Sequence, residues 1–408
     1  MITRTTCRVC EGSLELVLSL GDHYISNFIE PNGNDGLKAP LNLVLCKKCK
    51  LLQLQHTVPG DQMYLNYWYR SGTNKTMTEA LTDIANTCEN IINLQSGDSV
   101  LDIGCNDGTL LSAYKTKDIF KIGFDPAQNL TQFSSKVANK IVTDFFDADT
   151  YFKDNELIQH KPKIITSIAM FYDLEDPKKF VRDIKKVMHP NGLWVIQMSY
   201  LPLMLKTNEL GNVYQQHLEY YSLQSLEYLL NLFNFEIMDV ELNDVNGGSL
   251  RVYIKNKSND VFFNDERVKK LRKEEEKLKL DELQPYKDFA FRVERIKNDV
   301  VNFIKNETQN GKKVFVYGAS TKGNTLLQYF GLDNNLLIKA AERNKDKWGK
   351  VTVGTHIPII SEAEARLLNP DYFLVLPWHF IDEFQEREKD YLQSGGRFIV
   401  PMPYFSLR

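Results

Sequence analysis

The sequence lacks any long apolar run and any excess of one charge. No stretch approaches the ~20 consecutive apolar residues that a membrane-spanning helix needs, and the opening MITRTTCRVCEGS has no apolar core of a signal peptide. Its 50 basic and 53 acidic side chains give a net charge of −3, which does not favour binding to nucleic acid or to an anionic membrane. We therefore expect a cytoplasmic protein without such partners, and a monomer.

Cysteine is also scarce, with six in 408 residues, too few for a disulfide framework. Four of them form two C-x-x-C pairs, Cys7 with Cys10 and Cys46 with Cys49. Two such pairs supply the four thiolates that a tetrahedral Zn²⁺ needs, and a closed four-cysteine site is structural. Redox-active pairs are the alternative, but no βαβ pattern surrounds either pair. The spacing thus predicts a structural zinc site.

One glycine-rich turn predicts a cofactor site. Residues 99–103 have the pattern of a buried strand that runs into this turn, and residues 109–115 that of the following helix. In doubly wound α/β sheets, ligands bind beyond the carboxyl end of such a strand. The pattern differs from the G-x-G-x-x-G of dinucleotide-binding domains. It resembles the first motif of class I S-adenosylmethionine (SAM) methyltransferases, with Asp102, Gly104, Asn106 (where glycine is usual) and Gly108 at its key positions.

Acidic residues at the ends of the next two strands support this interpretation. Asp125, followed by Pro126, ends a strand about twenty residues after the turn, where a carboxylate accepts hydrogen bonds from ribose hydroxyls. Asp144, followed by Phe145, ends the next strand, and we expect it to meet the adenine amino group. A domain that binds NAD or no ligand is the alternative, but three elements in this order and spacing favour SAM.

Further alternating elements follow these motifs. Residues 163–170 and 193–198 have the pattern of strands, with an amphipathic helix over 180–188 between them. Residues 262–310 are highly charged, with apolar positions at helical spacing, and predict one or two linking helices. Residues 313–325 then repeat the order strand, glycine turn and helix, without the acidic pattern of the first turn.

Two later motifs narrow the interpretation. The stretches 214–223, YQQHLEYYSL, and 245–252, VNGGSLRV, together with the cysteine pairs and the first glycine turn, resemble the sugar C-methyltransferase family that makes branched deoxysugars. The resemblance covers essentially the whole chain. It implies an α/β fold with four parts: a β-rich zinc module (1–65), a SAM-binding Rossmann-like domain (66–255), a helical linker (256–310) and a C-terminal Rossmann-like domain (311–408) that supports nucleotide-sugar binding.

The resemblance also implies roles for individual residues. His217 matches the family's catalytic histidine, so it is the candidate general base. Gln216 stands beside it where the family usually has a glutamate, and an amide cannot raise the histidine's basicity as a carboxylate would. Tyr67 and Tyr69 match a tyrosine-rich motif and are candidates for orienting the sugar or assisting proton transfer; packing of the zinc module is their alternative role. The expected substrate-binding residues are Tyr214, Tyr221, Asn246, Arg251 and Lys322.

The expected reaction is methyl transfer to a carbon of a nucleotide-diphosphate 4-keto-sugar. A 4-keto group acidifies the neighbouring C3 proton, a base removes that proton, and the enolate carbon attacks the SAM methyl group. Methylation of oxygen or nitrogen on another nucleotide sugar or carrier-bound metabolite is the enzymatic alternative. A zinc-anchored scaffold that no longer binds SAM is the alternative of another class.

Overall fold

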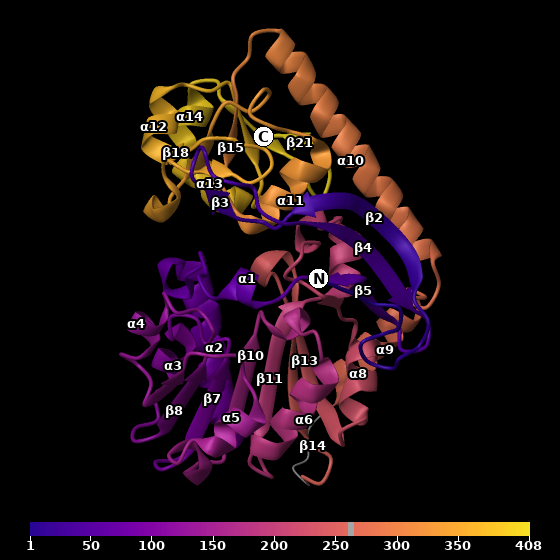
Figure 1. The fold of residues 1–408 in the computed structure, drawn as a ribbon, viewed down its shortest axis with the longest axis vertical. Coiled ribbons are helices and arrows are strands. Elements are labelled where there is room, and N and C mark those ends of the chain that lie inside the picture. Colours follow the sequence, from indigo (N-terminus) through magenta and orange to yellow (C-terminus); the bar gives the residue numbers. More distant parts are fainter. Residues whose placement is uncertain (260–264) are drawn as a thin grey trace.

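The structure, a computed structural model, describes residues 1–259 and 265–408. Two α/β domains lie one above the other in Figure 1, with strands of the N-terminal segment between them and one long helix along the side. The predicted linker includes residues 260–264, which lie outside the described residues. Within the described residues, no helix is both long and apolar enough to cross a membrane.

The first domain is built on a seven-stranded sheet. Its order is β13-β14-β11-β10-β7-β8-β9, in which β14 is antiparallel to both neighbours and the other pairs are parallel. The strands are β7 (Ser99–Ile103), β8 (Phe120–Phe124), β9 (Lys140–Val142), β10 (Ile164–Ile168), β11 (Leu193–Ser199), β13 (Phe235–Asn243) and β14 (Ser249–Asn256). The helices of this domain are α2 (Lys75–Ile92), α3 (Thr109–Ala113), α4 (Thr131–Ser134), α5 (Ala148–Lys153), α6 (Pro177–Val187), α7 (Leu201–Thr207) and α8 (Leu223–Asn231).

Local sequence explains these elements. Every residue of β7 is buried, as expected for a central parallel strand. Helix α6 begins where the side chain of Asp176 accepts a hydrogen bond from the Lys179 amide at 2.9 Å, with Pro177 at its first position. Its apolar residues recur at helical spacing and are buried against the sheet. Loops follow the carboxyl ends of the parallel strands, and these loops form the site.

The C-terminal domain is a second, smaller α/β unit. Its sheet has the order β18-β16-β15-β19-β20-β21, and only β21 is antiparallel to its neighbour. The strands are β15 (Val314–Tyr317), β16 (Ala340–Glu342), β18 (Ile359–Ser361), β19 (Tyr372–Val375), β20 (Arg397–Val400) and β21 (Ser406–Leu407). The helices are α11 (Thr321–Phe330), α12 (Glu362–Leu367), α13 (Ile381–Arg387) and α14 (Lys389–Gln393). The strand order reverses between β15 and β19, where such sheets bind ligands.

The N-terminal segment joins both domains. Its antiparallel strands β2 (Glu15–Tyr24), β4 (Lys38–Cys46) and β5 (Leu51–Leu54) extend onto β12 (Glu219–Tyr220), a strand from the first domain. Strand β3 (Phe28–Ile29) pairs with β17 (Val351–Thr352) of the C-terminal domain. Shorter elements are β1 (Ile2–Thr3), β6 (His56–Thr57) and α1 (Asp61–Tyr64). The linker forms α9 (Glu266–Glu276) and the long α10 (Gln284–Gln309), and α10 packs beside β2 in Figure 1.

Candidate active site

The four paired cysteines lie together at the turns of the N-terminal module. Their sulfur atoms all lie within 4.8 Å of one another, with 3.5 Å between Cys7 and Cys49 and 3.3 Å between Cys10 and Cys46. Four thiolates at these separations fit a tetrahedral Zn²⁺ with Zn–S bonds of about 2.3 Å. All four ligand positions are protein sulfurs, so such a zinc ion stabilises the module and offers no open position for catalysis.

A cavity of about 350 Å³ lies between the two domains. The carboxyl ends of the parallel strands of both sheets point toward it. The first domain lines it with residues that follow β7, β8 and β10, and the C-terminal domain with the turns after β15 and β19. Residues expected from the sequence that line this cavity are Tyr67, Tyr69, Asp102, Gly104, Asn106, Asp125, Pro126, Asp144, Phe145, Tyr214, His217, Asn246 and Lys322. The structure therefore brings residues from far apart in the chain around one space.

The glycine turn after β7 packs closely on Met170 and fixes an acid beside the cavity. Gly104 has φ 73°, and a Cβ there would lie 3.0 Å from Cγ of Met170. The amide of Asn106 donates a hydrogen bond to Oδ2 of Asp125 at 2.7 Å, and the amide of Ala127 donates to Oδ1 at 2.8 Å. These bonds hold the carboxylate at the end of β8, the position that binds ribose hydroxyls in related sheets.

A second carboxyl group lies below this turn. Asp102 is buried and accepts a hydrogen bond from the Thr166 hydroxyl at 2.6 Å. Burial, with a smaller contribution from the neighbouring Asp125, raises the pKa of Asp102 to about 7. SAM carries positive charge, so two carboxyl groups at one edge of the cavity fit this cofactor.

The remaining cofactor residues differ in how they contribute. Asp144 accepts a hydrogen bond from the Phe145 amide at 2.7 Å, and both line the cavity. Gly108 does not line it: this glycine starts α3 with φ 81°, and a Cβ there would lie 2.5 Å from Val137. The role of Gly108 is the close packing expected at the start of the helix.

His217 is buried, and both of its ring nitrogens have partners. Nδ1 lies 2.9 Å from the carbonyl oxygen of Asn212; because a carbonyl only accepts, this nitrogen carries the proton. Nε2 lies 2.9 Å from the hydroxyl of Tyr214, which therefore donates to it. The ring of Tyr172 lies 4.0 Å from that of His217. Burial, followed by the nearby charge of Lys322, lowers the pKa of His217 well below 6.5, so the ring is neutral and Nε2 can accept a proton.

The C-terminal domain contributes Lys322 to the other side of the cavity, where it meets carboxyl groups of the first domain. The Lys322 amine donates a hydrogen bond to Oδ1 of Asn212 at 2.6 Å, and burial lowers its pKa, opposed by Glu209 and Asp173. Glu209 is buried and accepts a hydrogen bond from the Trp378 indole. This end of the cavity therefore combines one amine with two carboxyl groups.

Besides Gly108, three residues expected at the site lie outside the cavity. Tyr221 is fully buried in the core, with its ring centroid 5.4 Å from that of Phe171. Arg251 points away along β14 and pairs with Asp83 at 2.8 Å. Gln216 lines a neighbouring groove instead. Gln216 and Tyr221 belong to the motif around His217 and Arg251 to the later motif at 245–252, but Tyr221 packs in the core and Arg251 lies in the sheet on β14.

Other residues that line the cavity were not anticipated from the sequence. Asp173 lies in the turn after β10 and has a buried Oδ1 without a hydrogen-bond partner among the described residues. Burial raises its pKa well above the usual value. Glu209, His379 and Tyr172 line the cavity as well. The position of Asp173 just after the fourth strand of the first domain could have indicated it as a site residue. No sequence feature indicates Glu209, because only the packing of the two domains brings it to the cavity.

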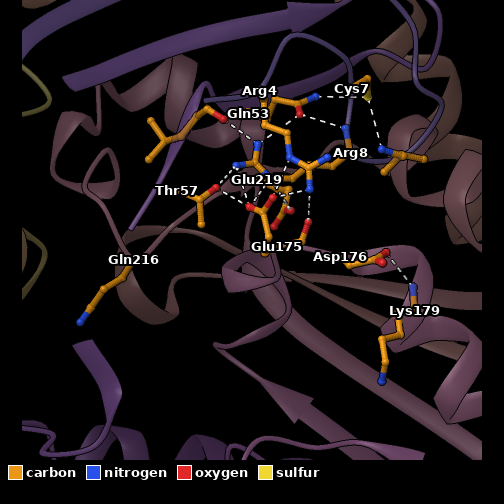
Figure 2. Close-up of polar contacts among 12 residues, drawn as sticks. Arg4, Cys7, Arg8, Gln53, Thr57, Glu175, Asp176, Lys179, Gln216 and Glu219 are labelled. Carbon is orange, nitrogen blue, oxygen red and sulfur yellow. Dashed lines mark hydrogen bonds and ion pairs between the residues drawn. The ribbon is translucent and has the colours of Figure 1, made fainter. Parts of the chain in front are cut away.

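The zinc module is connected to the loop that carries His217 (Figure 2). Gln53 on β5 donates a hydrogen bond to the sulfur of Cys7 at 3.2 Å and accepts one from the Arg8 guanidinium at 3.2 Å. Arg8 lies 3.7 Å from Glu219 on β12, two residues after His217. The cysteine cluster and the histidine loop are thus linked through one short strand pair.

Family models match three consecutive parts of the chain. A zinc binding domain matches residues 7–64, a methyltransferase domain residues 70–240, and a C-methyltransferase C-terminal domain residues 244–403. Among curated proteins, the C-methyltransferase NovU of Streptomyces niveus is 28% identical over 402 residues, which cover 97% of this chain and 95% of that protein.

Two solved structures align with less than half of the chain. A SAM-dependent methyltransferase from Clostridium acetobutylicum ATCC 824 is 14% identical, covers 44% of this chain and 92% of its own, and has a TM-score of 0.34. A SAM-dependent methyltransferase from Aquifex aeolicus is 16% identical, covers 43% and 97%, and has a TM-score of 0.32. The strand order of the seven-stranded sheet and the family models, and not these partial alignments, indicate the class of protein.

The chain is a class I SAM-dependent methyltransferase with a structural zinc site. Its seven-stranded sheet, its glycine turn beside two carboxyl groups and its matched methyltransferase domain define that class. The chain combines a part that matches a zinc binding domain, a part that matches a methyltransferase domain and a part that matches a C-methyltransferase C-terminal domain. The predicted fold class and the two predicted cofactors are confirmed, and the scaffold and NAD alternatives are set aside.

Proposed function

We propose that this enzyme methylates a carbon of a nucleotide-diphosphate-linked 4-keto-deoxysugar through an enolate. The observation that carries the proposal is the cavity itself. It joins the cofactor turn of one domain to the ligand-binding edge of a second Rossmann-like sheet, with a neutral buried histidine between them. One half suits SAM, and the other suits a nucleotide-linked substrate.

His217 and Tyr214 form the proposed proton-transfer pair. The Asn212 carbonyl fixes the proton on Nδ1, so Nε2 is the basic atom, and its partner is the Tyr214 hydroxyl. The C3 proton of the substrate passes to Nε2, either directly or through the Tyr214 oxygen as that hydroxyl gives its own proton to His217. The resulting imidazolium later releases this proton to solvent.

Other residues hold the substrate in this proposal. Tyr67 and Tyr69 line the cavity and supply hydroxyl donors for the enolate oxygen. Asn246 faces the sugar from the loop before β14. Lys322 follows the glycine turn of the C-terminal domain and is the cation for the diphosphate.

SAM, when bound, supplies the methyl group that the enolate carbon attacks. Residues that would hold SAM are those at the ends of the first three strands of the seven-stranded sheet: Asp102, Gly104, Asn106, Asp125, Pro126, Asp144 and Phe145. Their carboxyl groups compensate its positive charge, and Gly104 allows the turn its φ of 73° in close packing with Met170.

The test offers zinc-loaded enzyme and SAM to a panel of dTDP-, GDP- and CDP-linked 4-keto-6-deoxysugars in D₂O. Mass spectrometry and NMR should find a new carbon-bound methyl group on at least one sugar. Deuterium should enter C3 without SAM, because deprotonation precedes methyl transfer. Substitution His217→Asn should lower kcat on the order of 10²- to 10⁴-fold with little change in affinity for S-adenosylhomocysteine (SAH).

Matched variants sharpen the result. His189→Asn alters a histidine outside the cavity and should leave turnover unchanged. Tyr214→Phe should lose as much activity as His217→Asn if the hydroxyl relays the proton, and much less if it only orients the ring. A protein that binds SAH but methylates none of the keto-sugars, or methylates an oxygen or nitrogen, would refute the proposed substrate and chemistry.

A further inference from the structure

Residues 65–73, called the strap, contribute to the lining of the cofactor cavity. Three of its residues, Tyr67, Tyr69 and Ser71, line that cavity. The part from Leu65 to Arg70 belongs to no helix or strand. Its backbone groups therefore need other partners, and side chains of the SAM domain provide them.

Two asparagines bind the strap in the same way. The amide of Tyr67 donates to Oδ1 of Asn129 at 3.0 Å, and Nδ2 of Asn129 donates back to the Tyr67 carbonyl at 2.9 Å. The amide of Ser71 donates to Oδ1 of Asn106 at 3.0 Å, and Nδ2 of Asn106 donates to the Tyr69 carbonyl at 3.1 Å. Each side-chain amide thus satisfies one N–H and one C=O, as a neighbouring strand would.

Further contacts close the same interface. The Gly72 amide donates to Oδ2 of Asp107 at 3.0 Å, and a Cβ at Gly72 would lie 2.9 Å from that oxygen. The Arg70 guanidinium lies over the Phe133 ring, 3.8 Å from its centroid. The strap is therefore docked along its length on the turns after β7 and β8, the two turns that form the cofactor site.

We propose that Asn106 and Asn129 are positioning residues that dock the strap over the cofactor and thereby place Tyr67 and Tyr69 in the cavity. Asn106 occupies the position where glycine is usual in the motif, and its side chain has this specific use. Its own amide also donates to Asp125, the expected ribose-binding acid. One residue thus serves both the cofactor site and the strap.

Docking and cofactor binding are therefore coupled. A ligand held at Asp125 keeps the Asn106 turn in place, and a docked strap covers that ligand. Such coupling is reciprocal, because each event changes the equilibrium of the other by the same factor. This coupling concerns SAM binding only and does not depend on the proposed sugar substrate.

The test uses Asn106→Gly, Asn129→Ala and the control Asn139→Ala. Glycine accommodates the φ of 53° at position 106, so the first variant removes the side chain without backbone strain. Asn139 is a matched control: its side chain also accepts a hydrogen bond from a backbone amide, that of Lys121 at 2.8 Å, but it lies outside the cavity. Hydrogen exchange of peptides from the strap and calorimetry with SAH supply the readouts, with the melting temperature as a check of folding.

Loss of two hydrogen bonds should speed exchange of the strap amides on the order of tenfold and weaken SAH binding several-fold in both variants. The control should resemble the wild type, and SAH should slow strap exchange in the wild type. Unchanged strap exchange in folded Asn106→Gly and Asn129→Ala would overturn the docking role. Faster exchange with unchanged SAH affinity would overturn the coupling to the cofactor. A loss of keto-sugar activity has no bearing on either readout.

Discussion

The buried ion pair between Arg8 and Glu219 predicts a large and local loss of stability. Neither side chain has exposed surface, and neither carboxylate oxygen of Glu219 has a hydrogen-bond partner among the described residues. Arg8→Met fills much of the same space but leaves this carboxyl group without a cation. Breaking a buried pair costs about 3–5 kcal/mol, so the free energy of opening this region should fall by that amount at neutral pH.

The effect should depend on pH in a defined direction. Burial raises the pKa of Glu219 well above 4.5, and Arg8 opposes the shift. The folded state therefore holds this proton at pH values where the unfolded chain has lost it, so stability falls as pH rises above about 4.5. Without Arg8 the pKa rises further and this decline is larger. Below 4.5, where the carboxyl group is protonated in both states, the difference between variant and wild type should shrink.

Native-state hydrogen exchange of the paired strands β5 and β12 measures this free energy on zinc-loaded protein at pH 5 and pH 8. Arg4→Met is the control, because Arg4 pairs with Glu175 at a partly exposed site and should cost no more than about 1 kcal/mol. Arg8→Met combined with Glu219→Gln should recover about 2 kcal/mol of the single loss. Equal effects of Arg8→Met and Arg4→Met, or additive effects in the double variant, would refute the reasoning.

Further expectations concern the cofactor and metal sites. Affinity for SAM should rise as pH increases through about 7, because ionised Asp102 favours a cationic ligand, and calorimetry should find this dependence lost in Asp102→Asn. Gly104→Ala should weaken SAM binding, because a side chain at φ 73° strains the cofactor turn and its Cβ, 3.0 Å from Met170, presses on another residue that lines the cavity; equilibrium dialysis can measure this loss in a protein that remains folded by circular dichroism. Cys46→Ser should reduce bound zinc from one ion per chain toward none in elemental analysis and lower the melting temperature, since a four-thiolate site loses a ligand. The acidic limb of the pH–kcat profile should show no inflection near 6.5, because His217 acts as a base and its pKa lies well below that value; an inflection at 6.5 that disappears in His217→Asn would contradict the neutral, buried ring.

The sequence predicted the elements that depend on local spacing. The strand Ser99–Ile103 has the predicted bounds, and the strand predicted at 193–198 extends to residue 199. Nearly every residue of these strands is buried, so a run of apolar residues in the sequence predicts each strand directly. The cysteine pairs also identified their own site, because ligand pairs separated by two residues form by local turns and the two turns then meet through one hairpin-like module.

Tertiary structure alone decided which side chains meet. Tyr221 belongs to the motif around His217 and Arg251 to the later motif at 245–252. Tyr221 nevertheless lies in the core just after β12, and Arg251 lies in the sheet where β14 pairs with β11. Conversely, Glu209 reaches Trp378 across 169 positions of sequence, and nothing in the local pattern of either residue indicates that contact.

The strap, residues 65–73, shows the same division between what local sequence predicts and what tertiary packing decides. The sequence identified Asn106 as part of a cofactor motif, because the turn after the first strand of the domain is a local feature. Its second function, binding Tyr69 and Ser71 through its side chain, exists only because the two segments lie against each other. Local spacing thus determined the class of site, whereas packing between distant segments determined which residues complete it, because side-chain hydrogen bonds depend on positions that the backbone reaches only in the folded chain.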